Sequence, residues 1–478
     1  MTVAKNIHFG KRTDMDMTQG GIFKNLVKFS FPLLVGNLFQ QLYNMVDTWV
    51  IGQRGEDAAY AAVGNVGPII NILIGFFLGL STGASVVISQ YFGSKDQKKV
   101  HDTVHTSIAL TLILGVVFTV IGVLMTPLVL RLMLHSDGDA GADSAYPFAK
   151  TYLIIYFSGI IGNLIYNMCA GILRAIGDSR RPFYFLLVSA LTNTALDLLF
   201  VMVFDLGVAG VAFATIIAQA LSAALGVYVL LRSDSWIKLR IRDIKIDPGL
   251  LRQIVKVGIP AGIQTALTAF SNVFVQSYIS NTVGDQTLNL AGWTTYSKVD
   301  QFFYLPLQSL ALAITTFVGQ NLGVNNVERA KKGTYICYGI ATVCTVFVMV
   351  PVMIFADPIS SVFKNDPQII EKSAMLLHNL TPFYLFCCIN QVFSGAMRGA
   401  GNSRAPMIIM LFSFVAFRQV YLFIMSNFIS NELLPIGFGY PAGWICCAVI
   451  TLIYYKFFFR FDKFSLVKKT VDKEAVKA

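Results

Sequence analysis

Two acidic residues stand inside long apolar stretches and are the first candidates for chemistry: Asp47 in a stretch that begins near Phe29, and Asp197 in the run Leu-Asp-Leu-Leu-Phe. Inserting an Asp at the centre of a bilayer costs about 2.5–3.5 kcal/mol, so such a residue usually has a function. A desolvated carboxylate can bind a hard cation such as Na⁺ or take up a proton. Hydrogen bonding between helices is the competing interpretation.

Amide and hydroxyl oxygens accompany both acids. Asn193 precedes Asp197 by four residues, and Asn44 precedes Asp47 by three, so each pair shares one face of a helix. Further polar positions follow on the fourth and sixth apolar stretches, namely Asn163, Asn167, Thr215 and Gln219. For Asn163, hydrogen bonding between helices is the favoured interpretation. Together these side chains could ligate Na⁺, and the carboxylates alone could carry a proton.

A second charged group occurs in the other half of the chain. Lys298 and Asp300 lie in the eighth apolar stretch and Arg418 in the eleventh. The group is interpreted either as a substrate-facing or gating cluster or as a structural salt bridge, since buried ions of opposite sign are expected to pair. His101 and His105 are spaced i, i+4 without a third ligand nearby in the sequence, so no metal site is expected.

The composition excludes a soluble protein. Of 478 residues, 55% are hydrophobic and only 13% are charged, against roughly 25% charged in soluble domains. The mean hydropathy is +0.63. The net charge of +11 comes from short basic clusters between apolar runs, which is typical of cytoplasmic loops and not of a nucleic-acid site. All seven cysteines fall inside apolar runs, so neither a disulfide framework nor a metal cluster is expected.

Spans of about 20 residues give twelve transmembrane helices. We expect them near 26–51, 59–91, 104–134, 147–173, 183–204, 207–231, 251–280, 288–320, 334–356, 371–397, 405–428 and 437–459. With the N-terminus inside, 30 of the 37 Lys and Arg residues lie on the cytoplasmic side and 5 outside, which predicts that both termini are cytoplasmic. We expect no cleavable signal peptide at the N-terminus, because the first apolar stretch is too long for one.

The two halves of the sequence repeat each other. The segment 171–182 matches 395–406 at six of twelve positions, and the Gln-x-x-Gly at 90–93 matches that at 320–323. At these offsets Asn44 corresponds to Asn272, whereas the acids have no acidic counterpart. We therefore expect an all-α polytopic membrane protein of two six-helix lobes in parallel repeat, as in alternating-access transporters. The predicted parts are an N-lobe (1–232), a cytoplasmic linker (233–250), a C-lobe (251–460) and a cytoplasmic tail (461–478).

Several of these motifs resemble one family. They are the Pro32…Gln40-Gln41…Asn44…Asp47 pattern, both Gly-x-x-Arg-x-x-Gly-x-Ser-Arg-x-Pro turns, and Val-Gly-Gln-Asn-Leu-Gly at 318–323. The chain is similar over residues 20–460 to the multidrug and toxic compound extrusion (MATE) family, and to its DinF-like and MepA-like branch. The resemblance implies antiport of drugs, often cationic and aromatic, against Na⁺ or H⁺. It supports a cation site at Asp47, Asn193, Asp197 and Thr215, with Asn167 as a further candidate.

Two positions of the family pattern and the charged group of the second half are assigned to substrate contact or to gating. These are Gln40, Asn44, Lys298, Asp300 and Arg418. Pro32 permits a bend in the first helix, which cation binding is expected to alter; because Pro260 occupies the matching place in the second half, the bend could equally be architectural.

The expected function is secondary active efflux of amphiphilic compounds in exchange for Na⁺ or H⁺. The alternatives are a flippase for a lipid-linked precursor and an exporter of a narrow metabolite. No enzyme motif and no Walker-type loop occurs, so the energy must come from an ion gradient or from a downhill substrate. We expect a monomer in the bacterial cytoplasmic membrane, in contact with membrane lipid and a small-molecule substrate, with no cofactor, no metal and no nucleic acid.

Overall fold

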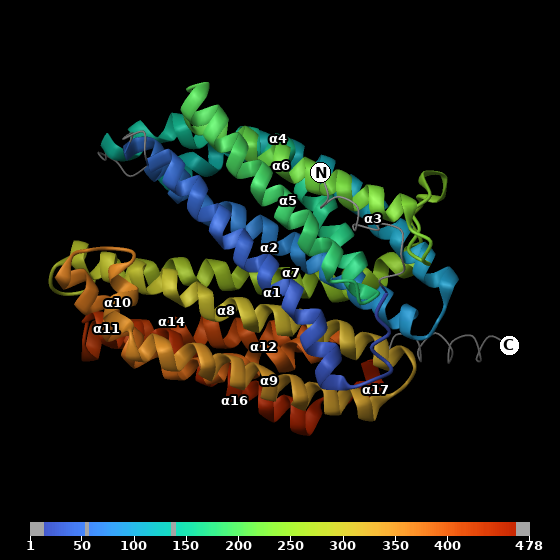
Figure 1. Ribbon diagram of the computed structural model, residues 1–478. Helices are drawn as coiled ribbons and strands as arrows, with labels where there is room; N and C mark the ends of the chain where they lie inside the picture. Colours follow the sequence, from blue (N-terminus) through green and yellow to red (C-terminus); the bar gives the residue numbers. More distant parts are fainter. Residues whose placement is uncertain (1–13, 53–56, 135–139, 465–478) are drawn as a thin grey trace. The chain divides into compact units, whose positions relative to one another are not determined.

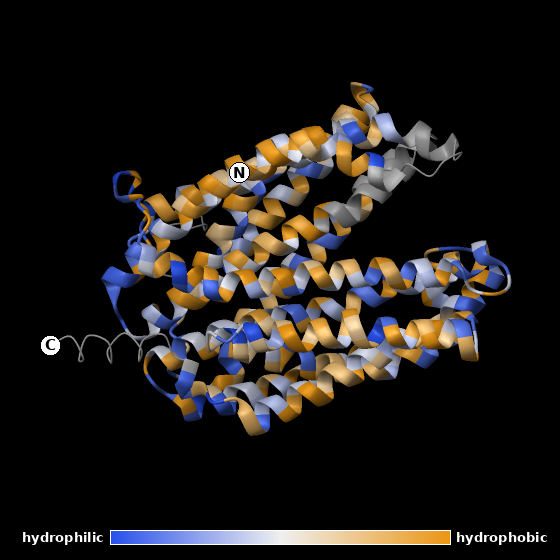
Figure 2. Ribbon diagram, turned by 180° about the vertical axis from the view of Figure 1, so that it is seen from behind, coloured by the Kyte–Doolittle hydropathy of each residue, from blue (hydrophilic) through white to orange (hydrophobic). Residues whose placement is uncertain are grey.

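A computed structural model describes residues 14–52, 57–134 and 140–464. These residues form helices and connecting turns, with no β-strand among them (Figure 1). Twelve helical stretches of the described chain are long and apolar enough to cross a membrane, which confirms the predicted number of spans and the all-α fold. In Figure 2 hydrophobic residues run along the helices, and most of the connecting turns are hydrophilic.

The chain divides into two compact units, each of which takes one segment from elsewhere in the sequence. Unit 1 contains residues up to Asp16 and Val35–Val255, and unit 2 contains Met17–Leu34 and the residues from Lys256 onward. Helices α1 and α7 therefore each begin in one unit and end in the other. The two units are not the two predicted lobes, because unit 2 includes residues 17–34 of the predicted N-lobe. The predicted boundaries of the lobes, the linker and the tail follow the sequence repeat and stay a prediction.

The longer helices of the first half are α1 (Ile22–Gly52), α2 (Asp57–Gly93), α3 (Gln97–Leu134), α4 (Ala140–Ala175), α5 (Arg180–Asp197) and α6 (Gly207–Arg232). A π-helical segment, η2 (Leu198–Val203), continues α5 to the end of its span. In unit 1, α4 packs against α2, α3 and α6, and α5 packs against α6. Glycines of α4 permit this closeness: a Cβ atom at Gly159 would lie 2.5 Å from Ile216 of α6.

The second half repeats this pattern with more interruptions. Its elements are α7 (Pro248–Ser280), α8 (Gln286–Gly323), α9 (Val327–Ile354), α10 (Ala356–Ser361), α11 (Pro367–Leu380), η4 (Thr381–Phe383), α12 (Tyr384–Gly399), α13 (Arg404–Met410), η5 (Leu411–Phe417), α14 (Arg418–Ile424), η6 (Met425–Ile429), α15 (Leu433–Gly437), α16 (Gly439–Ile453), η7 (Tyr454–Phe458) and α17 (Phe461–Phe464). In unit 2, α8 packs against α9, α11 and α12.

Equivalent glycines make equivalent helix contacts in the two units. A Cβ atom at Gly171 would lie 2.3 Å from Ser81 Oγ, and one at Gly395 would lie 2.7 Å from the carbonyl oxygen of Ala311. Gly171 corresponds to Gly395 in the repeat predicted from the sequence, and Ser81 corresponds to Ala311. Only a residue without a side chain allows the two backbones to approach this closely, which is a common helix contact in membranes.

The repeated turns also share one backbone conformation. Gly177 and Gly401 have φ of 87° and 95°, in the left-handed region that favours glycine. Each follows a helix C-terminus, and the next residue then caps the following helix: Asp178 Oδ1 accepts from the N–H of Arg181, and Asn402 Oδ1 from the N–H of Ala405.

Unit 2 holds its N-terminal segment through specific bonds. The buried Met17 donates its N–H to Gln320 Oε1 at 2.8 Å. The Arg329 guanidinium donates to the carbonyl oxygens of Met17, Gln19 and Gly20. Because the guanidinium has five donors in a planar fork, one side chain can fix several carbonyls of this segment.

Candidate cation and substrate sites

Helix α5 carries the best-defined part of the candidate cation site. Asn193 and Asp197 lie one turn apart, and their side chains are 2% and 0% exposed. Neither polar atom of the Asn193 amide has a hydrogen-bond partner among the described residues. A buried amide that is not hydrogen-bonded is costly, and sites of this kind usually receive a ligand or water.

The backbone beside Asp197 changes from α- to π-helical. Asp197 is the last residue of α5, and η2 follows it directly. Short π segments inside helices recur at functional sites because they alter which way the following side chains face. The acid therefore lies at an irregular point of its span.

Helix α6 contributes Thr215, which is 8% exposed. Its hydroxyl donates to the Val211 carbonyl at 2.9 Å, so the lone pairs of Oγ1 stay available for a ligand. The packing of α6 on α5 is fixed by Ser189, whose hydroxyl donates to the Ala218 carbonyl at 3.0 Å. The hydroxyl and the α5 carboxylate thus belong to two helices in contact.

On helix α4, Asn167 and Asn163 are bonded to one another. The Asn167 amide nitrogen donates to the backbone oxygen of Asn163 at 2.9 Å and to its Oδ1. The bond that the structure defines for the Asn163 side chain thus lies within α4, and its bonding to another helix stays a prediction. Asn167 keeps its own Oδ1 as an acceptor.

The α1 candidates are only partly described. The side chains of Asn44 and Asp47 lie outside the described residues, so their sites stay predictions. Gln40 is exposed. Pro32 is half-buried inside an α-helix that runs without interruption from Ile22 to Gly52.

In unit 2 the three predicted charges do not form a salt bridge. No ion pair joins Lys298, Asp300 and Arg418 within the part of the chain that the structure describes. The exposed Lys298 ammonium lies 5.7 Å from the ring centre of Phe363, and Asp300 accepts from the Tyr296 hydroxyl at 3.4 Å. The salt-bridge interpretation is therefore wrong, while substrate or gating roles stay a prediction.

Arg418 is instead held by an amide and two aromatic rings. It is 1% exposed, and its Nη1 donates to Asn272 Oδ1 at 3.0 Å. Its guanidinium carbon lies 4.7 Å from the ring centre of Phe414 and 4.8 Å from that of Tyr440, which is cation–π geometry. Neither ring was predicted from the sequence, although an aromatic residue four positions before an arginine is a detectable signal.

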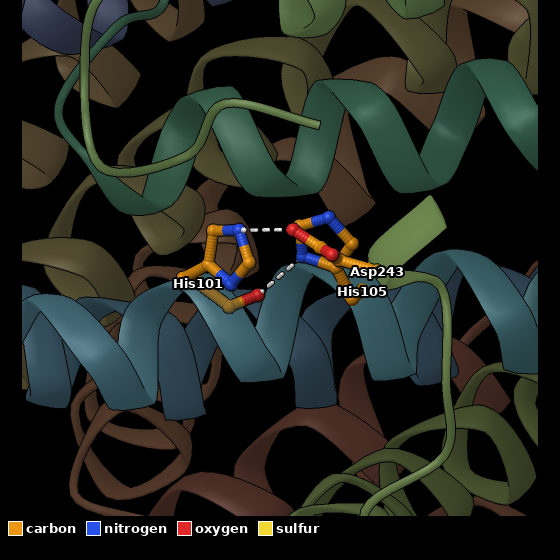
Figure 3. A group of neighbouring side chains, drawn as sticks. All are labelled: His101, His105 and Asp243. Carbon is orange, nitrogen blue, oxygen red and sulfur yellow. Dashed lines mark hydrogen bonds and ion pairs between the residues drawn. The ribbon is translucent and has the colours of Figure 1, made fainter. Parts of the chain in front are cut away.

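His101, His105 and Asp243 form a further cluster, shown in Figure 3. His101 Nε2 lies 3.7 Å from Asp243 Oδ2. His105 Nδ1 bonds to the His101 carbonyl at 2.7 Å, and its Nε2 accepts the Arg240 N–H at 3.0 Å. Both nitrogens of His105 are thus used in its neutral form, which leaves this ring no lone pair for a metal. These hydrogen bonds give His105 a structural role, and the absence of a metal site stays a prediction.

A family model and several curated proteins match this chain. The family model MatE matches residues 32–199 and 260–424. "Probable multidrug resistance protein YpnP" of Bacillus subtilis is 29% identical over 442 residues, which covers 92% of this chain and 96% of that protein. "Probable multidrug resistance protein NorM" of Thermotoga maritima is 26% identical over 458 residues, covering 91% and 92%.

A solved structure shares the fold. The structure described as "Crystal structure of MATE in complex with MaL6" superimposes with a TM-score of 0.87 at 23% identity, and covers 96% of this chain and 100% of the solved one. This likeness shows the fold, in agreement with the twelve helical spans.

Proposed function

The chain belongs to the MatE family of multi-pass membrane transporters, and we propose that it is a secondary active antiporter that exports amphiphilic, often cationic compounds in exchange for Na⁺ or H⁺. Its curated relatives are named as multidrug resistance proteins, and the family consists of transporters, not enzymes. The predicted family is thereby confirmed. The coupling ion, the substrate class and the alternating-access mechanism are the proposal.

One observation carries the proposal: a fully buried Asp197 one turn from an Asn193 amide whose polar atoms make no described hydrogen bond. Burial disfavours the charged carboxylate, and a bound cation or a proton removes that penalty. Asp47, Thr215 and Asn167 are proposed to complete the site. Na⁺ would use the amide and hydroxyl oxygens as ligands, whereas a proton needs only a carboxylate.

A single coupled ion is sufficient for useful export. One monovalent cation that enters down a potential of 100 mV releases about 2.3 kcal/mol. At about 1.4 kcal/mol per tenfold, this sustains roughly a 50-fold gradient of a neutral substrate. Coupling requires that the ion and the substrate favour different states of the transporter or compete for one site.

The substrate is proposed to meet Gln40, Asn44, Lys298, Asp300 and Arg418 during alternating access. Pro32 lacks an N–H and so weakens the helix there, which supports a bend that responds to cation binding. No cofactor is needed for this cycle.

A flippase for a lipid-linked precursor, or an exporter of a narrow metabolite, is the second candidate. Arg418 favours it, since this buried cation has no carboxylate within ion-pair distance among the described residues and would attract an anionic group. A cationic drug near Arg418 would be repelled. The acids of the first half support the antiporter more strongly.

The test is ethidium accumulation in pump-deficient bacteria that express the native chain or Asp197→Asn at matched levels. The native chain is expected to lower cellular dye, and the variant is not. Glu328→Gln, on an exposed turn, is the matched control and should behave as the native chain. Replacing Na⁺ by K⁺ in the medium then separates Na⁺ coupling from H⁺ coupling. Full efflux by Asp197→Asn would refute the cation site, and equal dye in all strains would favour the second candidate.

The cellular setting is part of the proposal. We place the chain in the bacterial cytoplasmic membrane as a monomer in contact with lipid, with both termini cytoplasmic. Reporter fusions at each terminus test this orientation: green fluorescent protein at either end should fluoresce, and alkaline phosphatase there should be inactive.

A further inference from the structure

The segment that joins α6 to α7, residues 233–247, is bonded to the side of helix α3. The Arg240 N–H donates to His105 Nε2 at 3.0 Å, and the Asp247 N–H donates to Thr106 Oγ1 at 3.1 Å. Two neighbouring residues of one helix thus receive the two ends of the segment 240–247. This segment is a fixed part of unit 1.

These bonds also set the depth of the segment in the membrane. His105 and Thr106 immediately precede the apolar stretch of α3, in which no charged residue occurs from Ser107 to Leu130. With 38 residues, α3 is about 57 Å long, whereas the hydrocarbon core is about 30 Å thick. The first turns of α3 therefore lie outside the hydrocarbon, and the bonded segment lies where the hydrocarbon begins. This is the level of the lipid headgroups.

The segment has one face on the protein and one face exposed. Ile237 and Leu239 are 0% and 4% exposed, and the Trp236 ring lies 5.4 Å from that of Phe92. These contacts hold the segment without help from Ile241, which is 71% exposed on the short turn η3 (Ile241–Asp243). An isoleucine this exposed has no packing role within unit 1.

Basic side chains surround the exposed isoleucine. Lys238, Arg240, Arg242 and Lys245 are all exposed. Two nearby acids are bonded within unit 1: Asp243 lies 3.7 Å from His101 Nε2 and 4.0 Å from Arg240 Nη1, and Asp247 accepts from the Leu250 N–H at 2.9 Å. No carboxylate pairs with Lys238, Arg242 or Lys245 among the described residues. The exposed face is therefore apolar at its centre and cationic at its rim.

We propose that this face is a docking site for anionic phospholipid headgroups, with Ile241 inserted among the upper acyl chains. Exposed apolar side chains flanked by Lys and Arg are typical of surfaces that lie in the membrane interface. The basic rim complements the negative charge of the cytoplasmic leaflet. The proposal concerns binding and does not depend on the transported substrate.

The experiment places an environment-sensitive NBD label on Ile241→Cys in full-length protein, in nanodiscs of phosphatidylcholine with or without phosphatidylglycerol. The signal from unsubstituted protein treated identically is subtracted, since it carries seven native cysteines. We expect the emission to rise and shift to the blue when phosphatidylglycerol is present, and high salt to reduce the change.

Two double variants, each of which removes two positive charges, distinguish lipid binding by the basic rim from general electrostatic attraction to the membrane. Arg242→Gln with Lys245→Gln should abolish the response to phosphatidylglycerol. Lys331→Gln with Lys332→Gln, which removes two exposed charges from α9 in unit 2, should leave it intact. A label that is already blue-shifted in detergent, no response to phosphatidylglycerol, or equal loss in both double variants would overturn the proposal. Size-exclusion chromatography of each labelled variant checks that it is folded.

Discussion

Arg418 donates from Nη1 to Oδ1 of Asn272, the residue that the internal repeat aligns with Asn44. In the first half the asparagine at this repeat position precedes an acid by three residues. In the second half the asparagine at the same position accepts a hydrogen bond from an arginine that is buried between two aromatic rings. In the sequence, one amide position is thus followed by an acid in the first repeat, and in the structure its counterpart bonds to an arginine.

The first prediction tests this bond by a double-mutant cycle. Arg418→Ala and Asn272→Ala should each lower the free energy of unfolding in detergent, and the double variant should lose less than the sum. A hydrogen bond to a charged group contributes about 1.5–3 kcal/mol, which sets the expected coupling energy. Chemical denaturation of all four proteins provides the measurement, and additive losses would show that the bond contributes nothing.

The second prediction concerns the Asn193 amide. Asn193→Ala should weaken binding of the coupling ion by up to about tenfold, because one hydrogen bond or ligand contact contributes about 0.5–1.5 kcal/mol. The measurement is the Na⁺ concentration, or the pH, at half-maximal efflux. Asn379→Ala is the control, since that exposed amide bonds only to its own helix, at the Met375 carbonyl. An unchanged midpoint in Asn193→Ala would remove this residue from the site.

The third prediction uses two glycines in opposite surroundings. At Gly177, φ is 87° and an added Cβ would lie 2.3 Å from the Met15 carbonyl oxygen, whereas at Gly339 a Cβ would meet no atom within 4 Å. Gly177→Ala should lower the melting temperature in detergent, since the left-handed conformation alone costs about 1–2 kcal/mol. Gly339→Ala should leave it unchanged or raise it, because alanine favours a helix by up to about 1 kcal/mol. Similar melting temperatures for the two variants would contradict this.

The fourth prediction concerns the bond between α3 and the segment 240–247. His105→Ala removes the acceptor of the Arg240 N–H, so hydrogen exchange in this segment should become faster. His101→Ala should have a smaller effect, because the His101 ring meets Asp243 only at 3.7 Å. Mass spectrometry of the peptides that cover 236–247 measures both, and equal exchange in the native chain and His105→Ala would show that the bond does not hold the segment.

The helices could be predicted from the sequence because their physical cause is local. Each span needs only a sufficient run of apolar residues, and the repeated turns need a glycine with positive φ, as Gly177 and Gly401 have. Asn193 and Asp197 could likewise be paired, since an i, i+4 spacing fixes their common face.

The partners of the charged residues could not be predicted, because they depend on packing. Charge alone suggested that Asp300 would neutralise Arg418, yet the arginine bonds to Asn272 of α7 and stacks on Tyr440 of α16. The π segments before Arg418 and after Asp197 were missed for the same reason: no sequence signal marks where a helix changes its hydrogen-bond register. Which side chains such a segment brings together is decided by the neighbouring helices.

The division of α1 between the two units has a consequence for how the protein is made. Residues 17–34 belong to unit 2, where Met17 and Arg329 hold the segment, yet the rest of unit 2 begins at Lys256. On the ribosome, the first element of this unit is synthesised before the whole of Val35–Val255 and must wait for its partners. A gene cut after Val255 would therefore yield a second fragment that lacks one of its own packing elements, so the second repeat is not a module that can be transplanted alone.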